Sequence, residues 1–283
     1  MTKIISVTGD LGSGKSTVSH LLCQQLNYEY IYTGKIQREI ASRYNMTTLE
    51  LNQYSETHPE IDDEIDSTFK SLNDSTDLIV DSRLAWFFIP KSFKVFLKTN
   101  LIVSANRISG DHQRENETYS STEEAVKKII ARKASENKRY RELYGVDCSD
   151  LSLFNLIVDT SFIAPERVAD IVLVEYERWL DSQECSKAFV SPTNLYPTRS
   201  IRNLPKDGKA NGFDLNVPVT VANLDSFDYI IDGHKRTSWA IKNHIDLLPV
   251  IYQKEIPDPV EPGWFLEWED FHSFRYLMYP ASH

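Results

Sequence analysis

Residues 9–16, GDLGSGKS, are of types that bind phosphate. Gly9, Gly14, Lys15 and Ser16 occupy the fixed positions of the pattern G-x-x-x-x-G-K-[ST]. A loop with few large side chains can wrap a phosphate chain and point backbone N–H groups at it, and a following helix start adds partial positive charge. The lysine then reaches the outer phosphates, and the serine hydroxyl binds a bridging magnesium ion. The pattern therefore predicts a site for ATP and Mg²⁺.

The residues on either side of this loop predict the elements that such a site needs. The hydrophobic run at 4–7 indicates a short buried strand. Val18, Leu21, Leu22 and Leu26 follow the loop at helical spacing. We therefore expect a strand, a glycine loop and a helix within the first 26 residues.

A second anion site is expected near the next strand, residues 28–34, which ends in Thr33-Gly34. The helix that follows carries Arg38 in its first turn. Gly34 allows close approach, and an arginine can bind a phosphate with two parallel hydrogen bonds. A solvated helix arginine is the alternative interpretation of Arg38.

A third buried strand, residues 78–81, ends in Asp81. Ligands of parallel α/β sheets bind at the carboxyl ends of the strands. Asp81 is therefore expected to contact the magnesium ion or its water shell, and Arg83 to face an acceptor phosphate. A fourth strand is expected at 94–97, and a fifth at 157–159.

Helical patterns separate these strands. They cover residues 101–107, which end in Arg107, and residues 123–144 and 165–180. A capped helix is expected from Thr47 or Thr48 with Glu50, followed by a helix at 58–72 whose acidic residues form a solvated face. Residues 109–122 indicate a mobile loop. Strands that alternate with helices predict a parallel sheet covered on both faces.

Arg132 and Arg139 lie seven residues apart in the 123–144 helix, so one helical face presents both. Phosphoryl transfer places charge on oxygens that must be neutralised, and arginines that close over the site can do this while excluding water. An exposed helix of mixed charge is the alternative.

Composition limits the class of protein. The chain has 283 residues, 41% hydrophobic and 25% charged, with a formal net charge of −10 and no massed basic run. This argues against a general nucleic-acid binder, although a local basic pocket remains compatible. Three scattered cysteines without metal spacing, a first strand in place of a signal peptide and no long apolar run predict a cytoplasmic protein without a membrane segment.

Up to about residue 180 the chain resembles the cytidylate kinases of the nucleoside monophosphate kinase group, most closely the archaeal type. The matching stretches are GDLGSGKS, TGKIQREIA, HPEIDDEID, VDSRLAW, VFLKTNLIVSANRI and ARKASENKRYRELYGVDCSDLSLFNLIVDTS. The resemblance implies an ATP-dependent kinase that phosphorylates CMP or dCMP.

By position, the resemblance also implies roles for single residues. ATP and magnesium would be held by Gly9, Gly12, Ser13, Gly14, Lys15, Ser16, Thr17, Asp81 and, bordering the base, Arg107. The monophosphate site would comprise Thr33, Gly34, Arg38 and Arg83. Arg132 and Arg139 would act as lid arginines. The family commonly has Gly where Ser82 stands, and Trp86-Phe87-Phe88 is bulky, so a modified nucleotide, a sugar or an amino acid is the alternative acceptor.

A polar stretch at 181–187 predicts a linker between domains at 1–182 and 188–283. Beyond it, PVTVANLD and FDYIID predict two strands, GHKR opens a helix, and LPVIYQK predicts a last strand. YPTR, DGHKR and LPV resemble the signature of the ParB/sulfiredoxin superfamily, which implies a smaller α+β domain after the P-loop NTPase domain. The sulfiredoxin cysteine is absent from DGHKR, which argues against thiol repair.

A turn such as DGHKR suits an anion, because backbone N–H groups and basic side chains surround it. The expected site comprises Arg199, Asp232, Gly233, His234, Lys235 and Arg236. It would handle a second nucleotide or, as an amino-acid kinase variant, use Asp232 or Asp228 as a base. A fold kept for packing, or a module that senses nucleotide or DNA, is the alternative, with DNA disfavoured. The aromatic tail from residue 257 is expected to pack against the domains.

Overall fold

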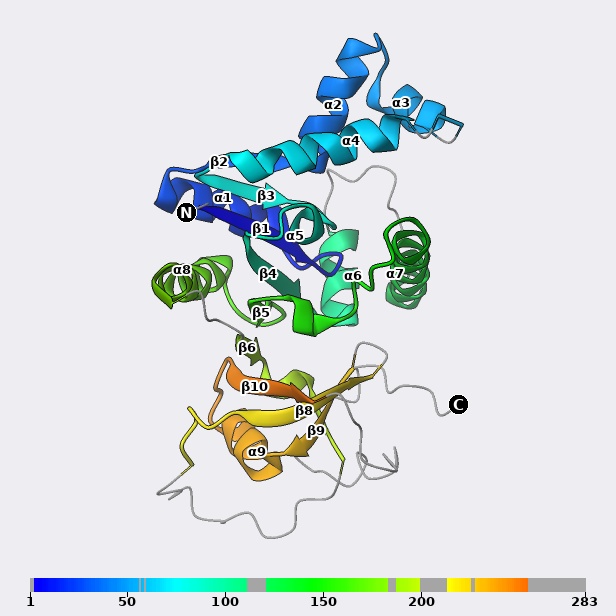
Figure 1. Ribbon diagram of the computed structural model, residues 1–283. Coiled ribbons are helices and arrows are strands. Elements are labelled where there is room, and N and C mark those ends of the chain that lie inside the picture. Colours follow the sequence, from blue (N-terminus) through cyan, green and yellow to red (C-terminus); the bar gives the residue numbers. More distant parts are fainter. Residues whose placement is uncertain are drawn as a thin grey trace.

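The computed structural model describes residues 3–55, 57–58, 60–110, 121–182, 187–198, 213–224 and 227–253. Most helices surround the strands of the first half of the chain, and the second half continues below them (Figure 1). The expectations for residues 111–120, Arg199, Cys185 and the aromatic tail lie outside the described residues.

In the first half, strands and helices alternate, as the hydrophobic pattern predicts. The elements are β1 (Ile4–Gly9), α1 (Lys15–Leu26), β2 (Glu29–Tyr32), α2 (Thr33–Arg43), α3 (Thr48–Ser55), α4 (Glu60–Ser71), η1 (Leu72–Asp74), β3 (Leu78–Asp81), α5 (Ala85–Phe88), β4 (Phe93–Lys98), α6 (Leu101–Ser109), α7 (Thr122–Tyr144), η2 (Leu151–Leu153), β5 (Leu156–Asp159) and α8 (Pro165–Ser182).

The second half consists mainly of short strands and one helix. Its elements are β6 (Lys187–Val190), η3 (Pro192–Asn194), β7 (Leu195–Pro197), β8 (Val219–Leu224), β9 (Phe227–Asp232), α9 (His234–Lys242) and β10 (Leu248–Gln253). The predicted pair at PVTVANLD and FDYIID is confirmed, since β8 and β9 pair antiparallel.

All ten strands of the described residues form one sheet, in the order β2-β3-β1-β4-β5-β6-β10-β8-β9-β7. From β2 to β6 neighbouring strands are parallel. β10 then pairs antiparallel with β6, for example Leu248 with Val190. The parallel part confirms the predicted α/β sheet. The division at residues 182 and 188 stays a prediction, and the sheet runs across it.

Helices cover both faces of the first half. Alternating side chains of β1 point to opposite faces: Ile4 joins one apolar cluster, and Ile5 and Val7 join another with α1 and α8. On the other face, α2, α4 and α5 pack on the Ile4 side, and α6 packs against α7 in a third cluster. In the part of the chain that the structure describes, each helix is too short or too polar to span a bilayer.

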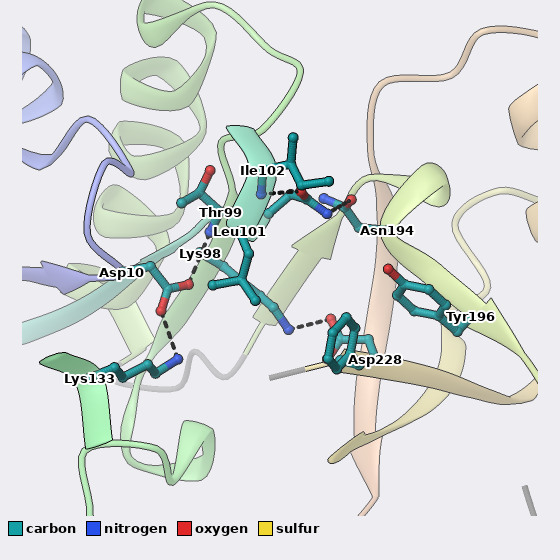
Figure 2. A pocket seen from close by; sticks show the side chains of 11 residues that line it. Asp10, Lys98, Thr99, Leu101, Ile102, Lys133, Asn194, Tyr196 and Asp228 are labelled. Atoms are coloured by element: carbon teal, nitrogen blue, oxygen red, sulfur yellow. Dashed lines mark hydrogen bonds and ion pairs between the residues drawn. The ribbon is translucent and has the colours of Figure 1, made fainter. Parts of the chain in front are cut away.

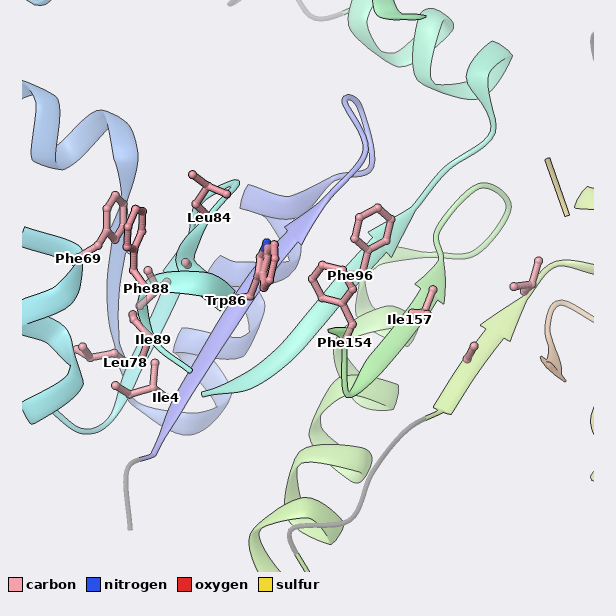
Figure 3. Packing of buried hydrophobic residues seen from close by; sticks show 14 of the residues in the cluster. Ile4, Phe69, Leu78, Leu84, Trp86, Phe88, Ile89, Phe96, Phe154 and Ile157 are labelled. Atoms are coloured by element: carbon pink, nitrogen blue, oxygen red, sulfur yellow. The ribbon is translucent and has the colours of Figure 1, made fainter. Parts of the chain in front are cut away.

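An aromatic core fills the face next to α5 (Figure 3). Trp86 packs edge-on against Phe154, with ring centroids 5.4 Å apart, and Phe154 contacts Phe96 at 5.0 Å. The same apolar cluster continues into the second half through Val190 and Val250. One continuous core therefore stabilises both halves.

Local details differ from expectation at two places, Thr33-Gly34 and α4, and agree with it at the start of α3. Thr33 and Gly34 form the first turn of α2 and do not end the preceding strand. Thr47 caps α3, because its hydroxyl accepts from the Glu50 N–H while the Glu50 carboxylate accepts from the Thr47 N–H. The prediction that the acidic residues of α4 form a solvated face is only partly correct, since Asp66 is buried.

A buried carboxylate fastens the two halves where β5 ends. Asp159 is 1% exposed. Its Oδ1 accepts from the N–H and the hydroxyl of Ser161, while its Oδ2 accepts from the Ser191 N–H at 3.1 Å and from Asn194 Nδ2 at 2.6 Å. Ser191 and Asn194 belong to the second half, so Asp159 joins the halves through side-chain chemistry as well as through the sheet.

We expect Asp159→Ala to lower the free energy of unfolding of the full chain by about 3 kcal/mol, because several buried donors lose their acceptor. Urea denaturation followed by circular dichroism measures this. Asp170→Ala, an exposed position in α8, is the matched control and should stay within about 0.5 kcal/mol of wild type. Equal effects of the two substitutions would contradict the fastening role of Asp159.

Candidate active site

The glycine loop has the shape that its sequence predicts. Gly9 has φ +148°, and a side chain there would place its Cβ 2.1 Å from the backbone oxygen of Leu97 in β4. Only glycine fits this close approach. The loop then enters α1 at Lys15, directly after Gly14. The N-terminal N–H groups of α1 therefore face the loop, as phosphate binding requires.

Lys15 lies over its own loop. Its Nζ donates to the backbone oxygens of Asp10 at 2.9 Å and Gly9 at 3.3 Å. Burial, and then the neighbouring Arg83, lower the pKa of Lys15 from 10.5 to about 7. A nearby phosphate would favour the charged form and reverse this shift.

The predicted metal-binding pair is brought together. Ser16 Oγ donates to Asp81 Oδ2 at 3.1 Å, so a hydroxyl and a carboxylate oxygen lie side by side at the loop. These hard oxygen donors fit magnesium, which keeps several waters and takes few protein ligands. Among the described residues there is no group of three or more His, Cys, Asp or Glu that could hold a metal ion.

Tyr30 also binds Asp81, which sequence reasoning missed. Its hydroxyl donates to Asp81 Oδ2 at 3.0 Å, and its ring stacks on Tyr32 with centroids 4.9 Å apart. Burial and the Asp81 carboxylate raise the pKa of Tyr30, so the hydroxyl stays a donor. In the register of β2 and β3, Asp81 lies opposite Tyr32 and Tyr30 lies opposite Ile79, so no local pattern predicts the contact of Tyr30 with Asp81.

Arg83 reaches the loop and connects it with α7. A guanidinium NH of Arg83 donates to the Gly9 backbone oxygen, which Lys15 also contacts. Arg83 Nε lies 3.2 Å from Glu136, and Arg132 Nε lies 2.9 Å from the other oxygen of the same carboxylate. Glu136 was not predicted. Its only sequence indication is its place four residues after Arg132 and three before Arg139.

Two other arginines that were predicted to bind phosphate, Arg139 and Arg38, contact side chains outside the glycine loop. Arg139 pairs with Asp62 of α4 at 2.7 Å, so it bridges two helices. Arg38 donates to the Tyr32 hydroxyl, and its guanidinium carbon lies 5.2 Å from the centre of that ring. Their expected phosphate contacts therefore remain predictions.

Arg107 borders the loop from α6. Its guanidinium donates to the backbone oxygens of Gly12 at 3.1 Å and Thr160 at 2.7 Å. Ser13 is buried, and within the described ranges its hydroxyl has no hydrogen-bond partner. Thr17 is exposed in the first turn of α1. Arg107 thus connects the glycine loop with the segment after β5.

A cavity opens beside the loop, under α7. We call it the Arg83 cavity after one of its lining residues. Its wall includes Arg83, Trp86, Glu136, Asn137 and Tyr140. Trp86 therefore serves both the apolar core and this cavity, and its indole N–H donates to the Arg83 backbone oxygen at 2.9 Å.

The DGHKR turn has the predicted strand-to-helix geometry. Gly233 has φ +103°, and Arg236 donates to Asp232 at 3.3 Å across the turn. His234 is buried and accepts from the Thr198 N–H through Nε2. This contact supports a structural role for His234. Lys235 is exposed, and Arg199 lies outside the described residues.

We expect ATP binding to load a proton onto Lys15. Its pKa of about 7 leaves it mostly neutral at pH 8, and the triphosphate restores its charge. Calorimetric titration of ATP with Mg²⁺ in buffers of different ionisation enthalpy should give uptake of about one proton at pH 8 and clearly less at pH 6. Lys15→Met should abolish this difference. Equal uptake by the wild type at both pH values would contradict the shifted pKa.

Comparison with known proteins agrees with this geometry. The cytidylate kinase-like family model matches residues 4–162. A cytidylate kinase from Sulfolobus acidocaldarius is 38% identical over 173 residues, which cover 60% of this chain and 91% of that relative. One from Pyrococcus furiosus is 36% identical over 170 residues, 60% and 85% of the two chains. One from Methanocaldococcus jannaschii is 36% identical over 174 residues, 60% and 94%. Since the family model spans more than half of its residues, the chain belongs to the cytidylate kinase-like family.

Proposed function

We propose that the protein is an ATP-dependent kinase that transfers the γ-phosphoryl group of ATP to CMP or dCMP. Family membership and three relatives named cytidylate kinase support the reaction and the acceptor. The structure supplies independent support, because the loop, Lys15, Ser16 and Asp81 are arranged as phosphoryl transfer requires.

One atom carries most of this proposal. The backbone oxygen of Gly9 accepts hydrogen bonds from both Lys15 and Arg83. Lys15 belongs to the triphosphate side, and Arg83 follows β3 and lines the Arg83 cavity. The cation of the donor side and the cation of the acceptor side therefore meet at one point, where a transferred phosphoryl group needs charge neutralisation from both.

On the donor side, the glycine loop and the start of α1 would hold the phosphates. The residues in this role are Gly9, Gly12, Ser13, Gly14, Lys15, Ser16 and Thr17, with Arg107 beside the base. Ser16 and Asp81 would hold Mg²⁺, which neutralises charge on the phosphates when bound. Catalysis is then positioning and charge neutralisation, and no covalent intermediate with the protein forms.

On the acceptor side, Thr33, Gly34, Arg38 and Arg83 would bind the monophosphate. The aromatic wall that Trp86 and Tyr140 give to the Arg83 cavity suits a nucleobase. Arg132 and Arg139 would neutralise the transferred group, which requires them to leave Glu136 and Asp62. Both pairs are at least a quarter exposed, so exchanging their partners costs little.

An acceptor panel tests the reaction. With ATP and Mg²⁺, we expect CMP and dCMP to give the highest kcat/KM among CMP, dCMP, UMP, AMP, a sugar and free amino acids, followed by ADP release. Lys15→Ala should lower kcat about 10³-fold without changing the circular dichroism spectrum. Lys91→Ala, an exposed lysine, is the matched control. Robust turnover of another acceptor with none of CMP would support the alternative acceptor classes.

For the second half we propose a ParB/sulfiredoxin-like module that binds a second nucleotide through the DGHKR turn. Gly233 has φ +103°, which turns the backbone from β9 into α9, and Arg236 Nε is buried with no hydrogen-bond partner among the described residues. These features favour an anion at Asp232, Gly233, Lys235 and Arg236, with Arg199 as a second clamp, while His234 supports the turn from its buried position. A DNA-sensing role is the competing proposal.

Arg236→Ala in the full chain should remove nucleotide binding at this second site and leave CMP phosphorylation intact, because the turn is separate from the glycine loop. Equilibrium binding of a fluorescent nucleotide in a Lys15→Ala background measures the second site, and ADP release with Lys15 intact measures CMP phosphorylation. Lys242→Ala in the last turn of α9 is the matched control. Unchanged binding in Arg236→Ala, or binding of duplex DNA instead, would exclude the nucleotide proposal.

A further inference from the structure

A carboxylate of the second half is buried beside the glycine loop. Lys98, the last residue of β4, places Nζ 2.5 Å from Asp228 Oδ2 of β9. Their side chains are 11% and 1% exposed. Figure 2 shows Lys98 and Asp228 extending toward each other from the two halves. A lysine of the kinase sheet thus has its counter-charge in the second half.

Asp228 is held by its own half. Asn223 Nδ2 donates to Asp228 Oδ1 at 2.6 Å, and the Tyr252 hydroxyl donates to Oδ2 at 3.1 Å. Lys98 Nζ also lies 5.6 Å from the centre of the Tyr252 ring. Asn223 and Tyr252 hold the carboxylate independently of Lys98, so Asp228 is a preformed acceptor for a cation.

A second ion pair lies on the other side of the same space. Asp10 of the glycine loop binds Lys133 of α7 at 2.9 Å, and its other oxygen accepts from the Thr99 N–H at 3.1 Å. Burial would raise the pKa of Asp10, but Lys133, Thr99 and Lys98 together outweigh it, and the pKa is lowered. Asp10 is therefore an ionised carboxylate that two lysines can reach electrostatically.

Both ion pairs line one cavity between the halves, which we call the seam cavity (Figure 2). Its wall includes Asp10, Lys98, Lys133, Tyr196 and Asp228. Asp10 and Lys133 also line the Arg83 cavity. The Asp10–Lys133 pair is therefore a wall shared by the site of phosphoryl transfer and by the seam with the second half.

Two carboxylates, Asp228 and Asp10, can supply the counter-charge of Lys98. A buried cation needs a counter-charge, and Asp228 supplies it. Without the Asp228 charge, Asp10 is the other carboxylate on the wall of the seam cavity. Lys98 would then compete with Lys133 for Asp10 and weaken the contact of α7 with the glycine loop. α7 carries Arg132 and Glu136, so the loss would reach the transfer site.

We propose that Asp228 is a positioning residue for phosphoryl transfer: by holding Lys98 it reserves Asp10 for Lys133 and keeps α7 docked on the glycine loop. This inference rests on the proposed kinase function. The second half is then part of the kinase's active-site architecture, whatever its own turn binds.

Steady-state kinetics of the full-length protein test whether the Asp228–Lys98 pair acts through the Asp10–Lys133 pair. Asp228→Asn should lower kcat/KM for CMP about threefold to thirtyfold. Removing the displaced cation as well, in Asp228→Asn/Lys98→Met, should restore most of the loss. In a Lys133→Met background, Asp228→Asn should have little further effect, because its target pair is already broken. Asp214→Asn, an exposed carboxylate of the same half that accepts from Asn216, is the matched control.

A packing role for Asp228 gives a different pattern. Its loss would then add to that of Lys133→Met, and Lys98→Met would not restore activity; either result overturns the proposal. Thermal unfolding of each variant shows that it is folded. Lys98→Met alone is the second variant, since Asp228 keeps its bonds from Asn223 and Tyr252, and it should retain nearly wild-type kcat/KM.

Hydrogen exchange separates this inference from the kinase proposal, because it needs no turnover. Amides of α7 around Lys133 should exchange at least about threefold faster in Asp228→Asn than in the wild type or in Asp214→Asn. Unchanged exchange would overturn the inference even if the enzyme phosphorylates CMP. A wild type without kinase activity would end the proposed function, and the exchange of α7 would still decide whether Asp228 holds it.

Discussion

The backbone ladder through β5, β6 and β10 holds both halves of the protein in one sheet. β6 has four residues, too few to be stable alone, and it pairs parallel with β5 and antiparallel with β10. Because hydrogen bonds of the ladder fix register, the residues that follow β6 are placed at the end of β5. Asp159 can therefore bind Ser191 and Asn194, and Lys98 can meet Asp228.

The direction of the strands decides where the charges meet. β1, β3, β4 and β5 are parallel, so their carboxyl ends lie at one edge of the sheet. Gly9, Asp81, Lys98 and Asp159 end these four strands. The formal net charge of the chain is −10, yet Lys15, Arg83 and Arg107 all bind backbone oxygens of the glycine loop at this edge. The overall negative charge therefore does not prevent basic side chains from gathering at one point of the molecule.

Most of the first half follows from short-range patterns. The glycine loop, the strands β1, β3, β4 and β5, and the helices α6, α7 and α8 were predicted close to their observed bounds from periodicity and motif spacing. Asp81 was also predicted beside the loop, because the edge rule for parallel sheets needs no knowledge of side-chain contacts. The capping of α3 was also predicted to within one residue, because a capping box joins residues only three positions apart.

The sequence by itself determined which segments form strands and helices, and it predicted which residues could bind phosphate, since both depend on neighbours within about ten positions. Only the tertiary structure decided the partners. The contacts that it decided join residues far apart in the sequence. Tyr30 and Asp81 are 51 positions apart, Arg83 and Glu136 are 53 apart, and Lys98 and Asp228 are 130 apart. Such contacts depend on how elements pack, and packing energy is distributed over the whole core rather than written in any one stretch.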